Sequence, residues 1–93
     1  MIPELKLTSR YSNVTYGEFH QVMKSLGFSY SRTQKGFRRY YHADSDTEVL
    51  VSAGEDDELI PSLYITEHGR VLDWRGIVDE DRFQEMLASQ KVA

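Results

Sequence analysis

One helical repeat, followed at once by three short alternating segments, most constrains the fold of this chain. Thr15 and Glu18 have the spacing of a capping box, and apolar side chains then recur with a helical period as far as Leu26. Gly27 follows directly, and glycine enters the left-handed conformation that ends many helices at little cost. We therefore predict a helix over residues 15–26.

The three segments that follow are typical of strands. Residues 28–33 alternate, residues 37–42 alternate, and residues 47–52 are rich in residues that favour strands. The connections contain Gly, Asp and Ser, which are turn-forming residues, and strands joined by such short loops pair in the antiparallel sense. In the second strand, one face is predicted to hold Phe37, Arg39 and Tyr41, and the other Arg38, Tyr40 and His42.

The last third of the chain predicts two further helices. Pro61 suits the first turn of a helix that Gly76 ends. Asp79 is placed to cap a short third helix, which Phe83 would dock onto the rest of the domain. The fold class is thus α+β, with the order α-β-β-β-α-α, in one domain over residues 15–90 that follows an N-terminal extension of residues 1–14.

Length and composition narrow the class of protein. With 93 residues, the chain has room for one domain. Its apolar runs are far shorter than the roughly 20 residues that cross a bilayer, and its N-terminus lacks the apolar region of a secretory signal. There is no cysteine, and hence no disulfide or thiolate metal site. We expect a cytoplasmic protein without a membrane segment.

The net charge of −4 conceals a strong asymmetry. Residues 1–42 carry seven Lys or Arg and two Asp or Glu, whereas residues 43–93 carry four and thirteen. A basic surface on an acidic protein is one interpretation, and it would favour phosphate ligands. The other is two charged faces that attract each other or a partner.

Residues that could hold a metal or act as catalytic bases are few. Asp44, Asp46, Glu48 and Glu55 have the spacing of a calcium loop, but Val49 occupies the position that requires glycine. We therefore predict no metal site and no cofactor. The histidines are scattered, and His20 and His68 are interpreted as partly exposed residues of helices.

The best candidate for function is the basic, aromatic segment of residues 35–42. Cationic side chains neutralise phosphates, and aromatic faces stack on unpaired bases. An ordinary strand, with arginine stems lying across tyrosines, would have the same composition. The predicted RNA-phosphate contacts are Arg32, Lys35, Arg38 and Arg39.

The same segment resembles a known family. Residues 15–16 and 26–28 (TY…LGF), residues 35–42 (KGFRRYYH), and residues 72–79 with 83 (LDWRGIVD…F) together resemble the HicA (YcfA-like) toxins, especially their longer bacterial relatives. The resemblance covers about residues 14–88. It implies a fold like the double-stranded-RNA-binding domain, α-β-β-β-α, here with an added C-terminal helix. It also implies a small mRNA interferase that a partner antitoxin neutralises.

The chain departs from that family at its catalytic residue. Family members begin the second strand with Gly-Ser-His, and that histidine is catalytic. Here Gly36 stands at the serine and Phe37 at the histidine. A phenyl ring transfers no proton, so the residue that acts as general acid or base in RNA cleavage by the family is missing here. His42 matches a second, non-catalytic position of the family and is the weak candidate that remains.

Three functions follow from these residues. The first is a HicA-like domain without nuclease activity that binds RNA or a small antitoxin-like protein. The second is a protein-interaction module that uses an exposed strand edge, including pairing with a second copy of itself, and has no nucleic-acid role. The third is an active endoribonuclease that uses His42.

Overall fold

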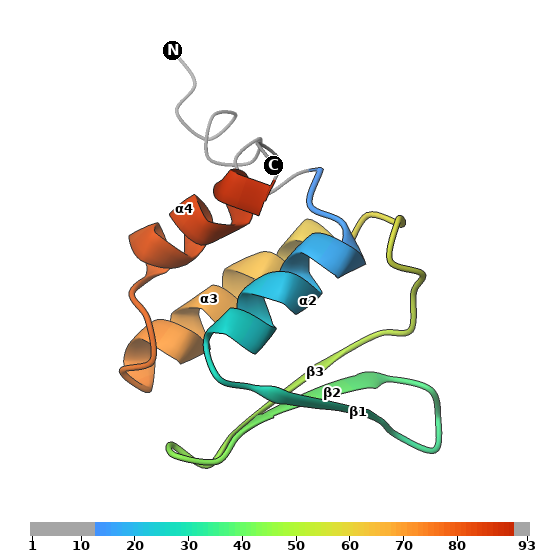
Figure 1. Ribbon diagram of the computed structural model, residues 1–93, viewed down its shortest axis with the longest axis horizontal. Helices are drawn as coiled ribbons and strands as arrows, with labels where there is room; N and C mark the ends of the chain where they lie inside the picture. The colour runs from blue at the N-terminus through green and yellow to red at the C-terminus, as the bar shows by residue number, and fades with distance from the viewer. Residues whose placement is uncertain (1–12, 91–93) are drawn as a thin grey trace.

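The computed structural model describes residues 13–90 and confirms the α+β class and the order α-β-β-β-α-α. Figure 1 shows the arrangement of three helices and one sheet. The elements are α2 (Tyr16–Ser25), β1 (Ser29–Arg32), β2 (Arg38–His42), β3 (Thr47–Val51), α3 (Ser62–Trp74) and α4 (Glu80–Gln90). Each strand is one or two residues shorter than its alternating pattern predicted.

The first helix begins and ends where its sequence signals lie. The Thr15 hydroxyl accepts a hydrogen bond from the Glu18 amide, and the Glu18 carboxylate accepts one from the Thr15 amide. Both halves of the predicted capping box are therefore present. The chain leaves α2 through Leu26 and Gly27, whose φ of +96° is left-handed.

The three strands form the predicted antiparallel meander, in the order β1-β2-β3. Arg32 lies opposite Arg38 in the first pair of strands, and Arg38 lies opposite Val51 in the second. Directly opposed side chains point to the same face of a sheet, so this register decides which residues from the three strands meet.

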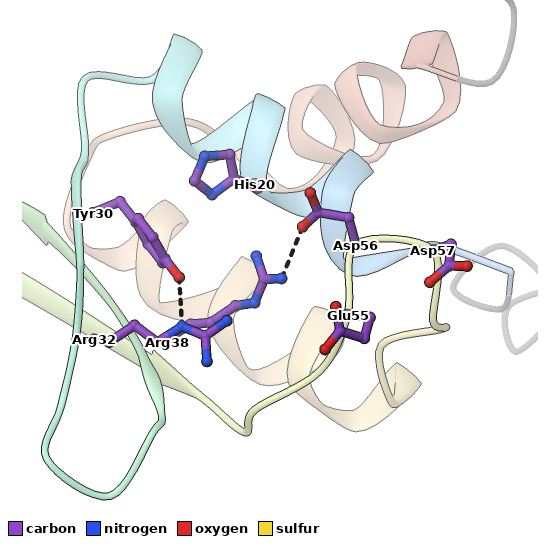
Figure 2. A pocket seen from close by; sticks show the side chains of 7 residues that line it. All are labelled: His20, Tyr30, Arg32, Arg38, Glu55, Asp56 and Asp57. Atoms are coloured by element: carbon purple, nitrogen blue, oxygen red, sulfur yellow. Dashed lines mark hydrogen bonds and ion pairs between the residues drawn. The ribbon is translucent and has the colours of Figure 1, made fainter.

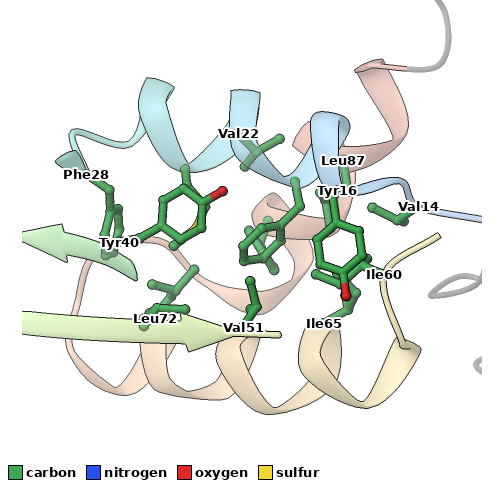
Figure 3. Close-up of a cluster of buried hydrophobic side chains, with 14 residues drawn as sticks. Val14, Tyr16, Val22, Phe28, Tyr40, Val51, Ile60, Ile65, Leu72 and Leu87 are labelled. Carbon is green, nitrogen blue, oxygen red and sulfur yellow. The ribbon is translucent and has the colours of Figure 1, made fainter. Parts of the chain in front are cut away.

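The helices lie over one face of the sheet, and α4 lies on the side of α2 and α3 away from the strands (Figure 1). The core fills the space between these layers (Figure 3). Phe19 of α2 is fully buried at its centre, with its ring against Tyr40 of β2 at 5.6 Å and Phe83 of α4 at 6.4 Å between centroids. One side chain thus connects the sheet to the outermost helix.

The predicted extension of residues 1–14 lies mostly outside the described residues. Of its described part, Val14 is 2% exposed and joins the core, and its carbonyl accepts a hydrogen bond from the amide of Ile60 at 2.8 Å. None of the helices within residues 13–90 is long and apolar enough to cross a membrane.

Candidate nucleic-acid interface

An open pocket lies between α2, the β3–α3 loop and the part of the β1–β2 hairpin next to its turn. Its volume is about 490 Å³. His20 of α2, Tyr30 and Arg32 of β1, and Arg38 of β2 line it, and residues 55–57 of the β3–α3 loop close the remaining side. Figure 2 shows these side chains converging from the helix, the two strands and the loop.

The hairpin brings two of the predicted phosphate contacts together. Arg32 and Arg38 are directly opposed on β1 and β2, so both side chains reach the same face and the same pocket. Lys35 lies exposed in the loop that joins these strands. Three of the four predicted basic contacts therefore occupy one end of the hairpin.

Arg38 is the most constrained of the basic residues. Its side chain is 4% exposed. Its Nη2 donates to the Gly54 carbonyl at 2.7 Å and to the Asp56 carboxylate at 2.8 Å, and its Nη1 lies 3.5 Å from the Tyr40 hydroxyl. The guanidinium also stacks over the Tyr16 ring, 5.2 Å from the centroid. Burial of an arginine is tolerable because these partners compensate for lost water.

The partner of this buried cation is unusually exposed. The Asp56 side chain is 80% exposed, although its carboxylate pairs with Arg38. The hydrogen bond from Arg38 lowers the pKa of Asp56 below its usual value, so the carboxylate is charged at neutral pH. Gly54 lets the loop approach closely, because a Cβ there would lie 2.2 Å from the Tyr16 ring.

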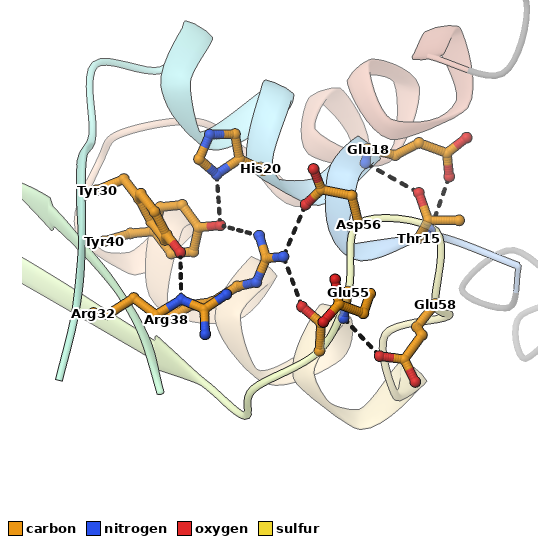
Figure 4. A network of polar contacts seen from close by, with 11 residues as sticks. Thr15, Glu18, His20, Tyr30, Arg32, Arg38, Tyr40, Glu55, Asp56 and Glu58 are labelled. Atoms are coloured by element: carbon orange, nitrogen blue, oxygen red, sulfur yellow. Dashed lines mark hydrogen bonds and ion pairs between the residues drawn. The ribbon is translucent and has the colours of Figure 1, made fainter. Parts of the chain in front are cut away.

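His20 belongs to the same network (Figure 4). Its Nδ1 lies 2.9 Å from the Tyr40 hydroxyl, and that hydroxyl oxygen also accepts from Arg38. Burial, and then the charge of Arg38, lower the pKa of His20, so its ring is neutral at pH 7. Since Tyr40 retains its own hydrogen for Nδ1, we assign the hydrogen of His20 to Nε2.

Tyr30 gives the pocket an aromatic wall. Its ring meets the His20 ring edge to face at 4.8 Å and lies 5.3 Å from the Tyr40 ring. Its hydroxyl accepts a hydrogen bond from Nε of Arg32 at 3.0 Å. The pocket thus combines two arginines and a partly exposed aromatic face with the three acidic residues of the β3–α3 loop.

Arg39, the fourth predicted contact, lies on the opposite face of the sheet. It is 38% exposed, pairs with Glu48 of β3 and stacks over Tyr41 at 5.2 Å. The predicted alternation of β2 is therefore present, but it separates Arg39 from the other three basic residues. The sequence predicted opposite faces for Arg38 and Arg39 but named both as phosphate contacts, because it could not show which face borders a pocket.

Phe37, which the resemblance to HicA toxins puts at their catalytic position, does not line the pocket. Phe37 is 42% exposed just before β2. Gly36 before it has a φ of +89°, a conformation that strains any other residue, including the serine of the family pattern. His42 lies at the far end of β2, where Nδ1 is 2.7 Å from the Ser45 hydroxyl and the ring packs on Phe28 at 5.0 Å.

Three acidic residues contact side chains of the basic half of the chain, two of them as ion pairs with arginine. Arg38 pairs with Asp56, Arg39 pairs with Glu48, and Asp46 accepts from the Tyr41 hydroxyl. Ion pairs thus connect the two charged halves of the chain at two places within the described residues. Within the described part of the chain, no three His, Cys, Asp or Glu side chains form a metal-binding group.

Sequence reasoning missed His20, Tyr30 and Asp56 as members of one site. The position of His20 beside the buried Phe19 was the available signal, because it puts the imidazole at the border of the apolar stripe. Nothing local marks Asp56 out from its acidic neighbours. Comparisons of this chain with protein-family models, curated proteins and solved structures gave no match.

Proposed function

We propose that this chain is a HicA-like RNA-binding domain of toxin–antitoxin origin that lacks nuclease activity and acts in the bacterial cytoplasm. The observation that carries the proposal is the paired placement of Arg32 and Arg38 beside the Tyr30 ring in one open pocket. Arginine donates to phosphate oxygens in a fixed planar geometry, and a tyrosine ring stacks on an unpaired base. Single-stranded RNA presents both groups together.

The proposal includes a fold like the double-stranded-RNA-binding domain. In this assignment α2, the sheet and α3 are the shared α-β-β-β-α unit, and α4 is the added helix. The element order and the antiparallel sheet support it. The resemblance of residues 35–42 to HicA toxins lies in β2 and the turn before it.

The test is a salt titration of binding to a fluorescent single-stranded RNA of about ten nucleotides. Affinity should fall steeply with salt, because bound cations replace condensed counterions. Arg32→Ala with Lys35→Ala should weaken binding about tenfold and reduce the logarithmic salt slope by about 0.7 for each lost phosphate contact. Both residues are exposed, so the fold should persist.

Arg70→Ala with Arg82→Ala is the matched control, since it also removes two positive charges, from exposed positions of α3 and α4. It should leave the affinity within about twofold of the wild type. No binding of the wild type at low salt, or equal losses in the control and the test variant, would refute the proposal.

The absence of nuclease activity is tested with the same RNA. The oligonucleotide should stay intact through prolonged incubation, because Phe37 cannot accept or donate a proton. Cleavage that disappears in His42→Ala would instead support an active interferase. His42 is half-buried against Phe28 and bonded to Ser45, which makes it a poor base for a bulky substrate.

A protein partner is the second candidate. Phe37 and Leu50 are 42% and 39% exposed. Leu50 is paired with Arg39, so the side chains of Leu50 and Arg39 lie on the sheet face opposite the helices. An antitoxin-like protein or a second copy of the chain would bury these side chains. Light scattering across a range of protein concentrations, with Leu50→Lys as the variant, tests the second copy directly.

A further inference from the structure

We propose that the Asp56 carboxylate occupies the site of an RNA phosphate on Arg38, and that a bound phosphate displaces it. The inference rests on the proposed RNA-binding function and deepens it. It assigns Arg38 as the inner phosphate subsite of the pocket and the β3–α3 loop as an internal competitor. Asp56 supplies the oxygen that a phosphate would supply, at 2.8 Å from Nη2.

Arg38 is held in position by groups other than Asp56. The Gly54 carbonyl accepts from the same Nη2 at 2.7 Å, and the Tyr16 ring lies under the guanidinium. These contacts would keep the cation oriented when Asp56 leaves. Its Nε has no hydrogen-bond partner within residues 13–90, although buried donors usually have one. An unpaired N–H on a buried arginine lowers the stability of the fold. A ligand that accepts a hydrogen bond from this N–H would remove that cost.

Asp56 itself is poorly suited to a purely structural ion pair. Its side chain is 80% exposed, whereas that of Arg38 is 4% exposed. The carboxylate makes one hydrogen bond to Arg38 through one oxygen, instead of the bidentate pair that arginine favours. An exposed carboxylate regains water when it leaves, so its displacement costs little. The dashed contact between Arg38 and Asp56 in Figure 2 is the bond that would be exchanged.

The neighbouring groups identify the ligand as the phosphate of single-stranded RNA. Arg32 is directly opposite Arg38, so a second arginine lines the pocket that Asp56 also lines. Tyr30 adds an aromatic face on the same side. A phosphate next to an aromatic wall fits a nucleotide unit better than it fits a phosphorylated peptide, which carries no base to stack.

Two variants with equal charge separate displacement from simple repulsion. Asp56→Asn and Glu58→Gln each remove one negative charge from the same exposed loop, but only Asp56 lines the pocket and bonds to Arg38. Binding of the fluorescent single-stranded RNA should tighten about fivefold to tenfold in Asp56→Asn and by less than about twofold in Glu58→Gln. Melting curves of both variants check that the fold is retained.

A direct readout of the wild type accompanies the variants. The side-chain carboxyl resonance of Asp56 should shift when RNA is added, as the carboxylate leaves Arg38, while that of Glu58, outside the pocket lining, should stay in place. A phosphoserine peptide is the comparison ligand. Tighter binding of the peptide than of RNA would overturn the assignment of the ligand.

The outcomes keep this inference apart from the proposed function. RNA binding that is equally tight in Asp56→Asn and Glu58→Gln, with an unmoved Asp56 resonance, would overturn the displacement while leaving RNA binding intact. No RNA binding by any of the proteins at low salt would overturn both.

Discussion

At the scale of single residues, the imidazoles hold the helices to the sheet. His20 of α2 bonds to the Tyr40 hydroxyl, and Nε2 of His68 in α3 lies 3.1 Å from the Leu50 carbonyl of β3. The sequence predicted that both histidines would be partly exposed helix residues. It could not predict their partners, which lie 20 and 18 residues away and depend on the register of the strands.

These histidines should make the protein less stable as the pH falls. Burial lowers the pKa of both His20 and His68 below 6.5, the value in the unfolded chain. Below about pH 6.5, the unfolded state therefore takes up protons before the folded state does. The free energy of unfolding should decrease between about pH 7 and pH 5.5, as measured by urea denaturation.

His68→Gln provides the test of this assignment. Glutamine keeps a donor for the Leu50 carbonyl but does not titrate. The variant should lose less stability than the wild type over the same pH range, and His20→Gln with His68→Gln should lose less still. Parallel stability curves for the wild type and both variants would contradict the assignment.

At the scale of elements, the sequence predicted best where signals are local. The capping box at Thr15 and the cap at Asp79 depend on residues within one helical turn, and both hydrogen bonds are present. The alternation of β2 was equally local and correct. The burial of each strand face is not a local property, because it depends on what covers the sheet. For that reason the sequence predicted the same role, an RNA-phosphate contact, for Arg38 and Arg39.

The capping box of α2 is expected to matter for stability. Thr15→Ala removes the hydroxyl that accepts from the Glu18 amide at 3.1 Å and leaves that amide without its cap. The free energy of unfolding should fall by about 1 kcal/mol. Thr15→Ser keeps the hydroxyl, so chemical denaturation should place it close to the wild type. An equal loss in both variants would assign the effect to the lost methyl group.

At the scale of the whole molecule, a few long-range contacts join the layers and the two charged halves of the chain. The ion pair of Arg38 and Asp56 joins β2 to a loop that is 18 residues distant. Phe19 touches rings from both the sheet and α4. Composition predicted a charge asymmetry, and periodicity predicted buried faces. Neither composition nor periodicity predicts the pocket, because it forms only where α2, β1, β2 and the β3–α3 loop meet in the folded chain.

The docking of α4 should be the most sensitive point of this arrangement. Phe83 is 1% exposed and packs edge to face against Phe19, so Phe83→Ala leaves a cavity next to the centre of the core. The loss should be about 3 to 5 kcal/mol, a large part of the stability of a domain of this size. Chemical denaturation followed by circular dichroism measures it.

The neighbouring Arg82 supplies the control, because it is exposed and pairs only along α4, with Glu85 at 3.4 Å. Arg82→Ala should change the free energy of unfolding by less than about 0.5 kcal/mol. Should Phe83→Ala not fold, Phe83→Leu keeps most of the volume and should lose about 1 kcal/mol. A loss below about 1 kcal/mol in folded Phe83→Ala would mean that α4 contributes little to the core. The pocket would then depend on α2, the sheet and the β3–α3 loop alone, and RNA binding by that variant should equal that of the wild type.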